Sequence, residues 1–361
     1  MKKLYVASFF IVIFFTFLVL EVGTRAYFCL QPGGKAGDFF SSNGGTYCSL
    51  PFSEYDPELG WKTSSNYRAN VFFRDENDNF KTTQYTTYDF GFRKFGNIES
   101  NKPKVFIVGD SFTHAINVDD SKTYYSKLDE ICEVFVYGAS GYGAYQEYLI
   151  LKKYVDLIRP DIIIIQFCGN DVSDGYLPLE RLSLYNNQGQ IRPYIGVDSS
   201  PYMAIPARNY FEKTLLFGNI VTKYSRFIFS LYQQLSRLSL EYMKLTNNYF
   251  ESSTPSSKIN MLKQEGYASV SNAYSLIKML KKCKLAVITT QDDLNLKKYC
   301  DAQGIELIDS HIKVFKEMLD NGKKVYGPDN YHWNDLGHEI VHQAVSGYIQ
   351  KQISSEVPIH P

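Results

Sequence analysis

Short runs of apolar residues recur from Lys104 onward, and stretches with helical character separate them. Runs without polar alternation are typical of strands that are buried on both faces of a parallel sheet. Strands and helices that alternate in this way predict an α/β fold with a doubly wound parallel sheet of about five strands. The runs are Val105–Val108, Val134–Tyr137, Ile162–Ile165, Leu285–Ile288 and Ile305–Ile308, and the helical stretches include Tyr145–Ile158 and Leu294–Ala302.

Other patterns flank this α/β region. Residues 29–103 begin with a Gly- and Ser-rich stretch, which predicts a linker. Aromatic and polar residues then alternate around turn signals, which predicts a small β-rich elaboration. We therefore expect the α/β domain to span residues 104–350, followed by a short tail at 351–361.

An insertion of about residues 175–260 separates the third and fourth apolar runs. Apolar side chains recur at helical spacing from Tyr224 to Leu238, which predicts an amphipathic helix within it. Such an element either packs over the domain or forms a lid or wall of a substrate pocket. A similar spacing over Gly337–Ile349 predicts a final helix that closes the sheet.

The amino terminus carries a long apolar segment. Leu4–Leu20 contains no charged residue and follows Lys2 and Lys3. As a helix this segment covers about 25 Å, near the lower limit for a membrane span, so residues 1–28 predict a transmembrane signal anchor. A cleaved secretory signal is the alternative. The lysines place the amino terminus in the cytoplasm, which predicts a single-pass protein of the cell inner membrane with a periplasmic, extracytoplasmic α/β domain.

Charge and cysteine content narrow the function classes. The 38 Lys and Arg residues balance the 38 Asp and Glu residues, so the chain lacks the positive field that gathers nucleic acid. In an oxidising compartment Cys29 could pair with Cys48, and Cys283 with Cys300. No Cys and His spacing resembles a zinc site, and we expect no metal.

The first apolar run leads into a candidate nucleophile. In an open parallel sheet, ligands bind beyond the carboxyl ends of the strands. Gly109 permits a sharp turn there, and Ser111 stands at the start of the next helix. Ser111 in this position is either a nucleophile or part of an ordinary helix cap made by Asp110 or by Ser111 itself.

The second and third runs end in loops that could stabilise negative charge. The second leads into a glycine-rich loop that includes Gly141, whose backbone N–H could approach a ligand oxygen. The third leads into Asn170, whose side-chain amide could donate to a developing oxyanion. The alternative is that Asn170 and Asp171 form a common turn pair.

A candidate base lies near the carboxyl end of the chain. His332 follows Asp329 by three residues in a turn-rich loop, so the carboxylate could hold one ring nitrogen and leave the other free as a base. His114 is closer to Ser111 in sequence, but three residues along a helix point it away from the turn. We therefore favour His332 and interpret the remaining histidines as surface or packing residues.

These blocks resemble, in their order along the chain, the SGNH or GDSL-like hydrolase superfamily, which is named for a Ser, a Gly, an Asn and a His. The resemblance implies a three-layer α/β/α SGNH-type fold. It implies that Ser111 is the nucleophile, His332 the general base and Asp329 its orienting partner. It also implies an oxyanion hole made by the backbone N–H groups of Ser111 and Gly141 and the side chain of Asn170.

Further residues refine the resemblance. Tyr55–Trp61 and Tyr88–Arg93, together with the anchor, resemble the membrane-anchored bacterial branch of the superfamily. Phe112 replaces the usual leucine of the first block, a change expected to affect packing only. Trp333 follows the histidine where many members have proline, so the shape of a typical acyl pocket does not carry over.

The resemblance implies a serine esterase that acts through an acyl-enzyme on ester-linked acyl groups, in particular acetyl groups of a cell-envelope polysaccharide. The same residues would also serve an O-acetyltransferase of an extracytoplasmic glycan, in which a sugar hydroxyl replaces water. A non-catalytic envelope scaffold is the second alternative. No cofactor is implied. The expected partners are the ester substrate and, through the N-terminal helix, the membrane.

Overall fold

The strands form a mixed sheet whose order matches a doubly wound fold. The structure is a computed structural model that describes residues 2–30, 53–77, 79–182, 191–204, 225, 227–228, 230–231, 255–280 and 283–355. The 6-stranded sheet has the order β12-β11-β8-β6-β7-β5. Its strands are β5 (Lys94–Phe95), β6 (Lys104–Gly109), β7 (Glu133–Gly138), β8 (Ile162–Phe167), β11 (Lys284–Thr289) and β12 (Glu306–Ile308).

Every predicted apolar run corresponds to a parallel strand of this sheet. β5 adds an antiparallel edge strand that pairs with β7 and that the sequence analysis did not predict. The chain passes from β6 to β7 on one side and then returns to β8 on the other, so the strand order reverses beside β6. Ligand sites of such sheets lie at this reversal, beyond the carboxyl ends of the strands.

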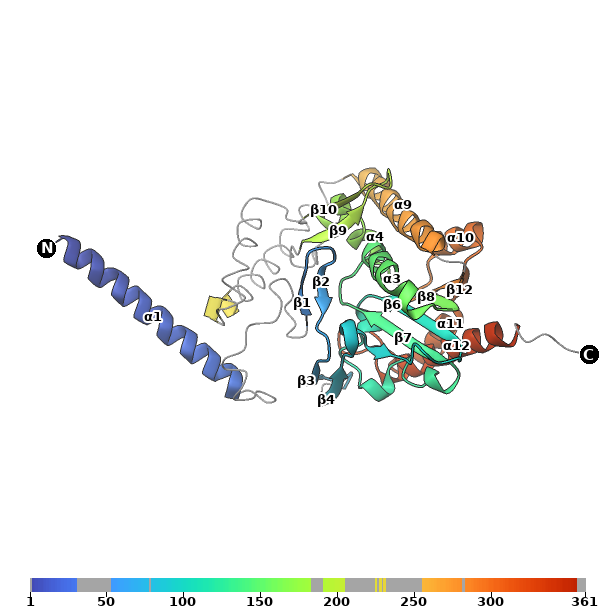
Figure 1. The fold of residues 1–361 in the computed structure, drawn as a ribbon, viewed down its shortest axis with the longest axis horizontal. Helices are drawn as coiled ribbons and strands as arrows, with labels where there is room; N and C mark the ends of the chain where they lie inside the picture. Colours follow the sequence, from blue (N-terminus) through green and yellow to red (C-terminus); the bar gives the residue numbers. More distant parts are fainter. Residues whose placement is uncertain are drawn as a thin grey trace, which may run out of the picture.

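Helices cover both faces of the sheet, as Figure 1 shows. Successive residues of β6 alternate between two buried clusters: Phe106 and Val108 face one, whereas Val105 and Ile107 face the other. The first cluster includes side chains of α3 (Ala144–Ile158), α9 (Ser256–Leu280) and α10 (Leu294–Gln303), and the second includes side chains of α11 (Ser310–Asp320) and α12 (Asp335–Ser354). The predicted three layers are therefore confirmed.

Hairpins and one long helix precede the sheet. α1 (Lys2–Leu30) contains a stretch, Ser8–Tyr27, that is long and apolar enough to cross a membrane, although a signal sequence would have the same character. The hairpins are β1 (Ser53–Asp56) with β2 (Gly60–Thr63), and β3 (Arg68–Arg74) with β4 (Phe80–Thr86). Short 3-10 turns are η2 (Asp89–Gly91), η3 (Asp120–Lys122) and η4 (Leu128–Glu130).

The insertion is not purely helical where the structure describes it. It contains α5 (Leu177–Glu180) and then a hairpin of β9 (Arg192–Ile195) and β10 (Pro201–Ala204), before α9 begins at Ser256. All four residues of β9 are buried, but they include Arg192 and Pro193, so the strand shows neither an apolar run nor a polar alternation in the sequence. Most of the predicted amphipathic helix at 224–238 lies outside the described residues, although Phe227 and Ile228 are helical.

One candidate disulfide is absent. Cys300 is a buried free thiol, so it is not joined to Cys283. Burial raises the pKa of the Cys300 thiol to about 11. The other candidate pair cannot be compared, because Cys48 lies outside the described residues.

Candidate active site

The turn after β6 fixes the position of Ser111. A Cβ atom at Gly109 would lie only 2.3 Å from Thr113 Oγ1, so this turn requires glycine. α2 (Ser111–His114) follows at once, and Asp110 caps it by accepting a hydrogen bond from Phe112 N at 3.0 Å. Because Asp110 makes the cap, the Ser111 hydroxyl is free for another contact.

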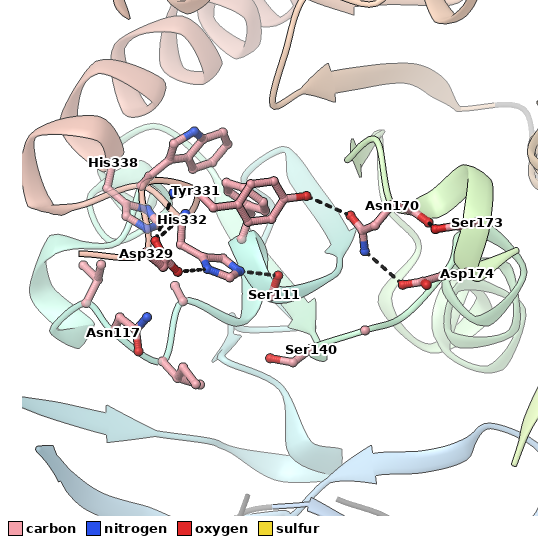
Figure 2. Close-up of a pocket in the computed structure, with 16 residues that line it drawn as sticks. Ser111, Asn117, Ser140, Asn170, Ser173, Asp174, Asp329, Tyr331, His332 and His338 are labelled. Carbon is pink, nitrogen blue, oxygen red and sulfur yellow. Dashed lines mark hydrogen bonds and ion pairs between the residues drawn. The ribbon is translucent and has the colours of Figure 1, made fainter. Parts of the chain in front are cut away.

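Ser111, His332 and Asp329 form one hydrogen-bonded chain (Figure 2). His332 Nε2 lies 2.7 Å from Ser111 Oγ, and His332 Nδ1 lies 2.5 Å from Asp329 Oδ2. Because a carboxylate only accepts, Nδ1 carries the proton and Nε2 is the acceptor for the serine hydroxyl. The fold thus joins residues that are 221 positions apart.

Backbone contacts fix the Asp329 carboxylate. Asp329 Oδ1 accepts hydrogen bonds from Tyr331 N at 3.0 Å and His332 N at 3.1 Å. Partial burial acts to raise the pKa of Asp329, but the hydrogen bonds from His332 and Tyr331 outweigh it and hold the pKa below its ordinary value. Asp329 is therefore ionised at neutral pH.

The predicted donors border the same cavity as the chain, which has a volume of about 720 Å³. Gly141 has a φ of 77°, a conformation that glycine adopts without strain. The backbone N–H groups of Ser111 and Gly141 have no hydrogen-bond acceptor among the residues that the structure describes. Both N–H groups are therefore available to a ligand oxygen.

Two neighbours fix the orientation of the Asn170 amide. Asn170 Nδ2 donates to Asp174 Oδ2 at 3.0 Å, and Asn170 Oδ1 accepts from the Tyr331 hydroxyl at 3.3 Å. Asn170 precedes α4 (Asp171–Asp174), so the amide and its acceptor belong to one turn of chain. One hydrogen of Nδ2 remains for a ligand beyond the bond to Asp174.

The sequence analysis missed Tyr331 and underestimated Phe112. Tyr331 OH lies 2.7 Å from Cys168 Sγ, and burial raises the pKa of that thiol well above its ordinary value, so the S–H stays neutral. The ring of Phe112 lies 4.9 Å from the ring of His332 and lines the cavity, so its role extends beyond the packing that was expected. No local spacing marks these contacts.

His114 takes part in a different chain. Its Nδ1 lies 2.9 Å from Ser140 Oγ, and its Nε2 lies 2.6 Å from Tyr85 OH. Burial, assisted by the Arg93 charge, lowers the pKa of His114 well below its ordinary value. His114 is therefore a neutral, buried residue, and no hydrogen bond joins it to Ser111 in the described part of the chain.

Buried acids lie beneath the site. Asp110, Glu147 and Asp171 are fully buried, and burial raises the pKa of each carboxyl. Repulsion by the Asp110 carboxyl adds to the shift of both Glu147 and Asp171. Within the described residues, no group of three or more His, Cys, Asp or Glu side chains is arranged to hold a metal ion.

Comparison with known proteins identifies the family. The sequence model of GDSL-like lipases and acylhydrolases matches residues 105–345. The chain belongs to this family. As a member, it is an SGNH-type serine hydrolase that acts on ester bonds. No curated protein matches the chain.

Solved structures with a similar fold include several esterases. A lipase/acylhydrolase from Enterococcus faecalis is 13% identical, with 69% of this chain and 96% of the other covered and a TM-score of 0.36. An acetylxylan esterase from Geobacillus stearothermophilus is 14% identical, with 69% and 94% covered and a TM-score of 0.37. A family 3 carbohydrate esterase from Clostridium thermocellum is 13% identical, with 70% and 98% covered and a TM-score of 0.32.

Proposed function

We propose that this hydrolase uses Ser111 as its nucleophile, His332 as its general base and Asp329 as the residue that orients His332. The observation that carries the proposal is the hydrogen-bonded chain, with 2.7 Å between His332 and Ser111 and 2.5 Å between His332 and Asp329. Both distances lie within hydrogen-bonding range for proton transfer.

The reaction begins when His332 Nε2 takes the proton of Ser111 Oγ and the oxygen attacks the carbonyl carbon of the ester. Asp329 stabilises the imidazolium that forms. The N–H groups of Ser111 and Gly141 and the amide of Asn170 hold the oxyanion, and each such donor lowers the barrier by roughly 3 kcal/mol.

Breakdown of the tetrahedral intermediate completes the acylation. His332 returns its proton to the leaving alcohol as the C–O bond breaks, which leaves the acyl group on Ser111. A water molecule, deprotonated by His332 in turn, then attacks the acyl-enzyme and releases the acid. His332 returns this proton to Ser111 Oγ as the acyl–oxygen bond breaks, which restores the free enzyme.

The proposed substrate is an ester-linked acyl group, in particular an acetyl group, on a polysaccharide of the cell envelope. The exposed aromatic ring of Tyr331 borders the cavity, and such rings pack against sugar faces. An extracytoplasmic location follows if α1 is retained as an anchor with its lysines in the cytoplasm.

Ester turnover tests this proposal directly. The full-length protein in detergent should hydrolyse p-nitrophenyl acetate, and Ser111→Ala should lose at least about a thousandfold of kcat. Asn117→Ala, which also borders the cavity, is the matched control and should retain activity. Equal turnover by wild type and Ser111→Ala would overturn the proposal.

Acyl transfer to a sugar is the second candidate. The cavity of about 720 Å³ is far larger than an acetyl group and has room for an acceptor beside it. If added oligosaccharides accept the acyl group faster than water does, the protein is an O-acetyltransferase. If no glycan affects hydrolysis, it is an esterase.

A further inference from the structure

A buried arginine of the insertion lies between the two loops that carry Gly141 and Asn170. Arg192 begins β9 and is fully buried. Its Nη2 donates to the carbonyl oxygen of Gly141 and, at 2.6 Å, to Gln146 Oε1. The guanidinium therefore holds the Gly141 loop directly at its backbone.

The same guanidinium reaches Asn170 through Asp174. Arg192 Nη1 lies 3.7 Å from Asp174 Oδ1, and the other carboxylate oxygen of Asp174 accepts the hydrogen bond from Asn170 Nδ2 at 3.0 Å. Arg192 Nη1 also donates to Glu180 Oε1 at 3.1 Å. One side chain thus connects both loops that border the cavity opposite His332.

The charge of Arg192 is well compensated. Burial alone would lower its pKa, but the Glu180 and Asp174 carboxylates outweigh this effect and keep the guanidinium charged. The guanidinium carbon lies 5.2 Å from the ring of Trp61, and Trp61 Nε1 donates to the carbonyl of Ser140 at 3.2 Å. Trp61 and Arg192 thus hold adjacent peptides of the same loop.

An arginine suits this position better than a lysine does. A planar guanidinium presents several donors in a fixed geometry, whereas a lysine offers a compact charge on a flexible stem. Oxyanion donors act only when they are held near the position that the oxyanion will occupy. The relative placement of the Gly141 N–H and the Asn170 amide therefore depends on the group that connects them.

We propose that Arg192 is a positioning residue of the oxyanion hole, which fixes the Gly141 N–H and the Asn170 amide relative to each other. This inference rests on the proposed function of Gly141 and Asn170. It assigns the hairpin of the insertion a part in catalysis that differs from packing over the domain and from forming a lid.

The test compares Arg192→Lys and Arg192→Met with Ser269→Ala in the full-length protein. Ser269 Oγ donates to the carbonyls of Gly175 and Ile195, so its loss loosens the same hairpin without touching either oxyanion donor. Arg192→Lys preserves the charge opposite the carboxylates and should fold even if Arg192→Met does not. Circular dichroism and melting temperature establish folding for each variant.

Kinetics then separate positioning from stability. We expect Arg192→Lys to lower kcat by about 10- to 100-fold with KM changed less than threefold, because donor placement acts on the transition state. Phenylboronic acid, which forms a tetrahedral adduct with Ser111, should bind more weakly by the same factor. Ser269→Ala, with a melting temperature similar to that of Arg192→Lys, should retain the kcat of wild type within about threefold.

A double mutant tests the connection through Asn170. In the Asn170→Ala background, Arg192→Lys should lower kcat by a smaller factor than in wild type, because one of the two positioned donors is already absent. The inference is overturned if folded Arg192→Lys retains kcat within twofold, if its whole loss lies in KM, or if Ser269→Ala loses as much. Absence of ester turnover in wild type would instead overturn the proposed function. Failure of the Arg192 inference and failure of the proposed function are therefore distinguishable.

Discussion

At the scale of single residues, Tyr331 and Asp174 hold the two ends of the Asn170 amide. Tyr331 contacts its oxygen, and Asp174 contacts its nitrogen. The Tyr331 hydroxyl donates to Asn170 Oδ1 and lies 2.7 Å from Cys168 Sγ, to which Thr290 Oγ1 donates at 3.4 Å. The chain of hydrogen bonds from Thr290 to Asn170 fixes Oδ1 as the end of the amide that faces Tyr331. The Nδ2 end is then the donor that we propose for the oxyanion.

Tyr331→Phe should lower kcat by about 3- to 10-fold, the value of one net hydrogen bond, and leave KM nearly unchanged. Steady-state kinetics on p-nitrophenyl acetate measure both constants. Tyr326→Phe is the control, because Tyr326 lies in the same region of the chain but does not line the cavity. An unchanged kcat in Tyr331→Phe would show that the Asn170 amide does not depend on the hydrogen bond from the Tyr331 hydroxyl.

The sequence was sufficient to predict the residues of the hydrogen-bonded site. It was not sufficient to predict the residues that support them. Ser111, Asn170 and His332 lie in loops that follow apolar runs or turn signals, and the strand order brings these loops to one edge. Tyr331 and Arg192 act through contacts across the fold. Because such contacts leave no periodic signal in the chain, local patterns could not predict them.

At the scale of elements, three buried acids lie near the site: Asp110 directly after β6, Glu147 in α3 and Asp171 at the start of α4. Glu147 of α3 is fully buried, and neither of its carboxyl oxygens has a partner within the described residues. Burial and the nearby Asp110 carboxyl raise the pKa of Glu147 well above its ordinary value. The folded protein therefore keeps Glu147 protonated at a pH where the unfolded chain releases the proton.

This difference makes stability fall as pH rises. Above the unfolded pKa of about 4.3, the folded state binds more protons than the unfolded state, so the free energy of unfolding decreases with pH until the raised folded pKa is reached. Glu147→Gln should remove the part of this dependence that Glu147 contributes. Its melting temperature relative to wild type should increase from pH 5 to pH 8, whereas the exposed control Glu99→Gln should show a constant difference. A difference for Glu147→Gln that does not change with pH would contradict the raised pKa.

The elements themselves were predicted unevenly. The helices α3 and α10 begin or end within one residue of the predicted stretches, because their apolar spacing and their terminating residues are local features. The β9–β10 hairpin and the β5 edge strand were missed. β5 contains only Lys94 and Phe95, which is too short for any periodicity to show.

At the scale of the whole molecule, the apolar helix and the hydrolase domain require different surroundings. The side chains from Phe9 to Leu20 are all exposed, and so large an apolar surface is unfavourable in water. We expect the full-length protein to enter the detergent phase of Triton X-114, and the double variant Phe14→Lys, Leu18→Lys to move to the aqueous phase. The same phase for both proteins would contradict membrane anchoring by α1.

In the proposed reaction Ser111 attacks the ester and His332 takes its proton. The most direct measurement is covalent labelling of the full-length protein with a fluorophosphonate, followed by mass spectrometry of the labelled peptide. We expect one label, on Ser111, and labelling slowed at least about a hundredfold in His332→Ala. A label on Ser140, which also lines the cavity and lies 2.9 Å from His114, or equal labelling of His332→Ala, would contradict it.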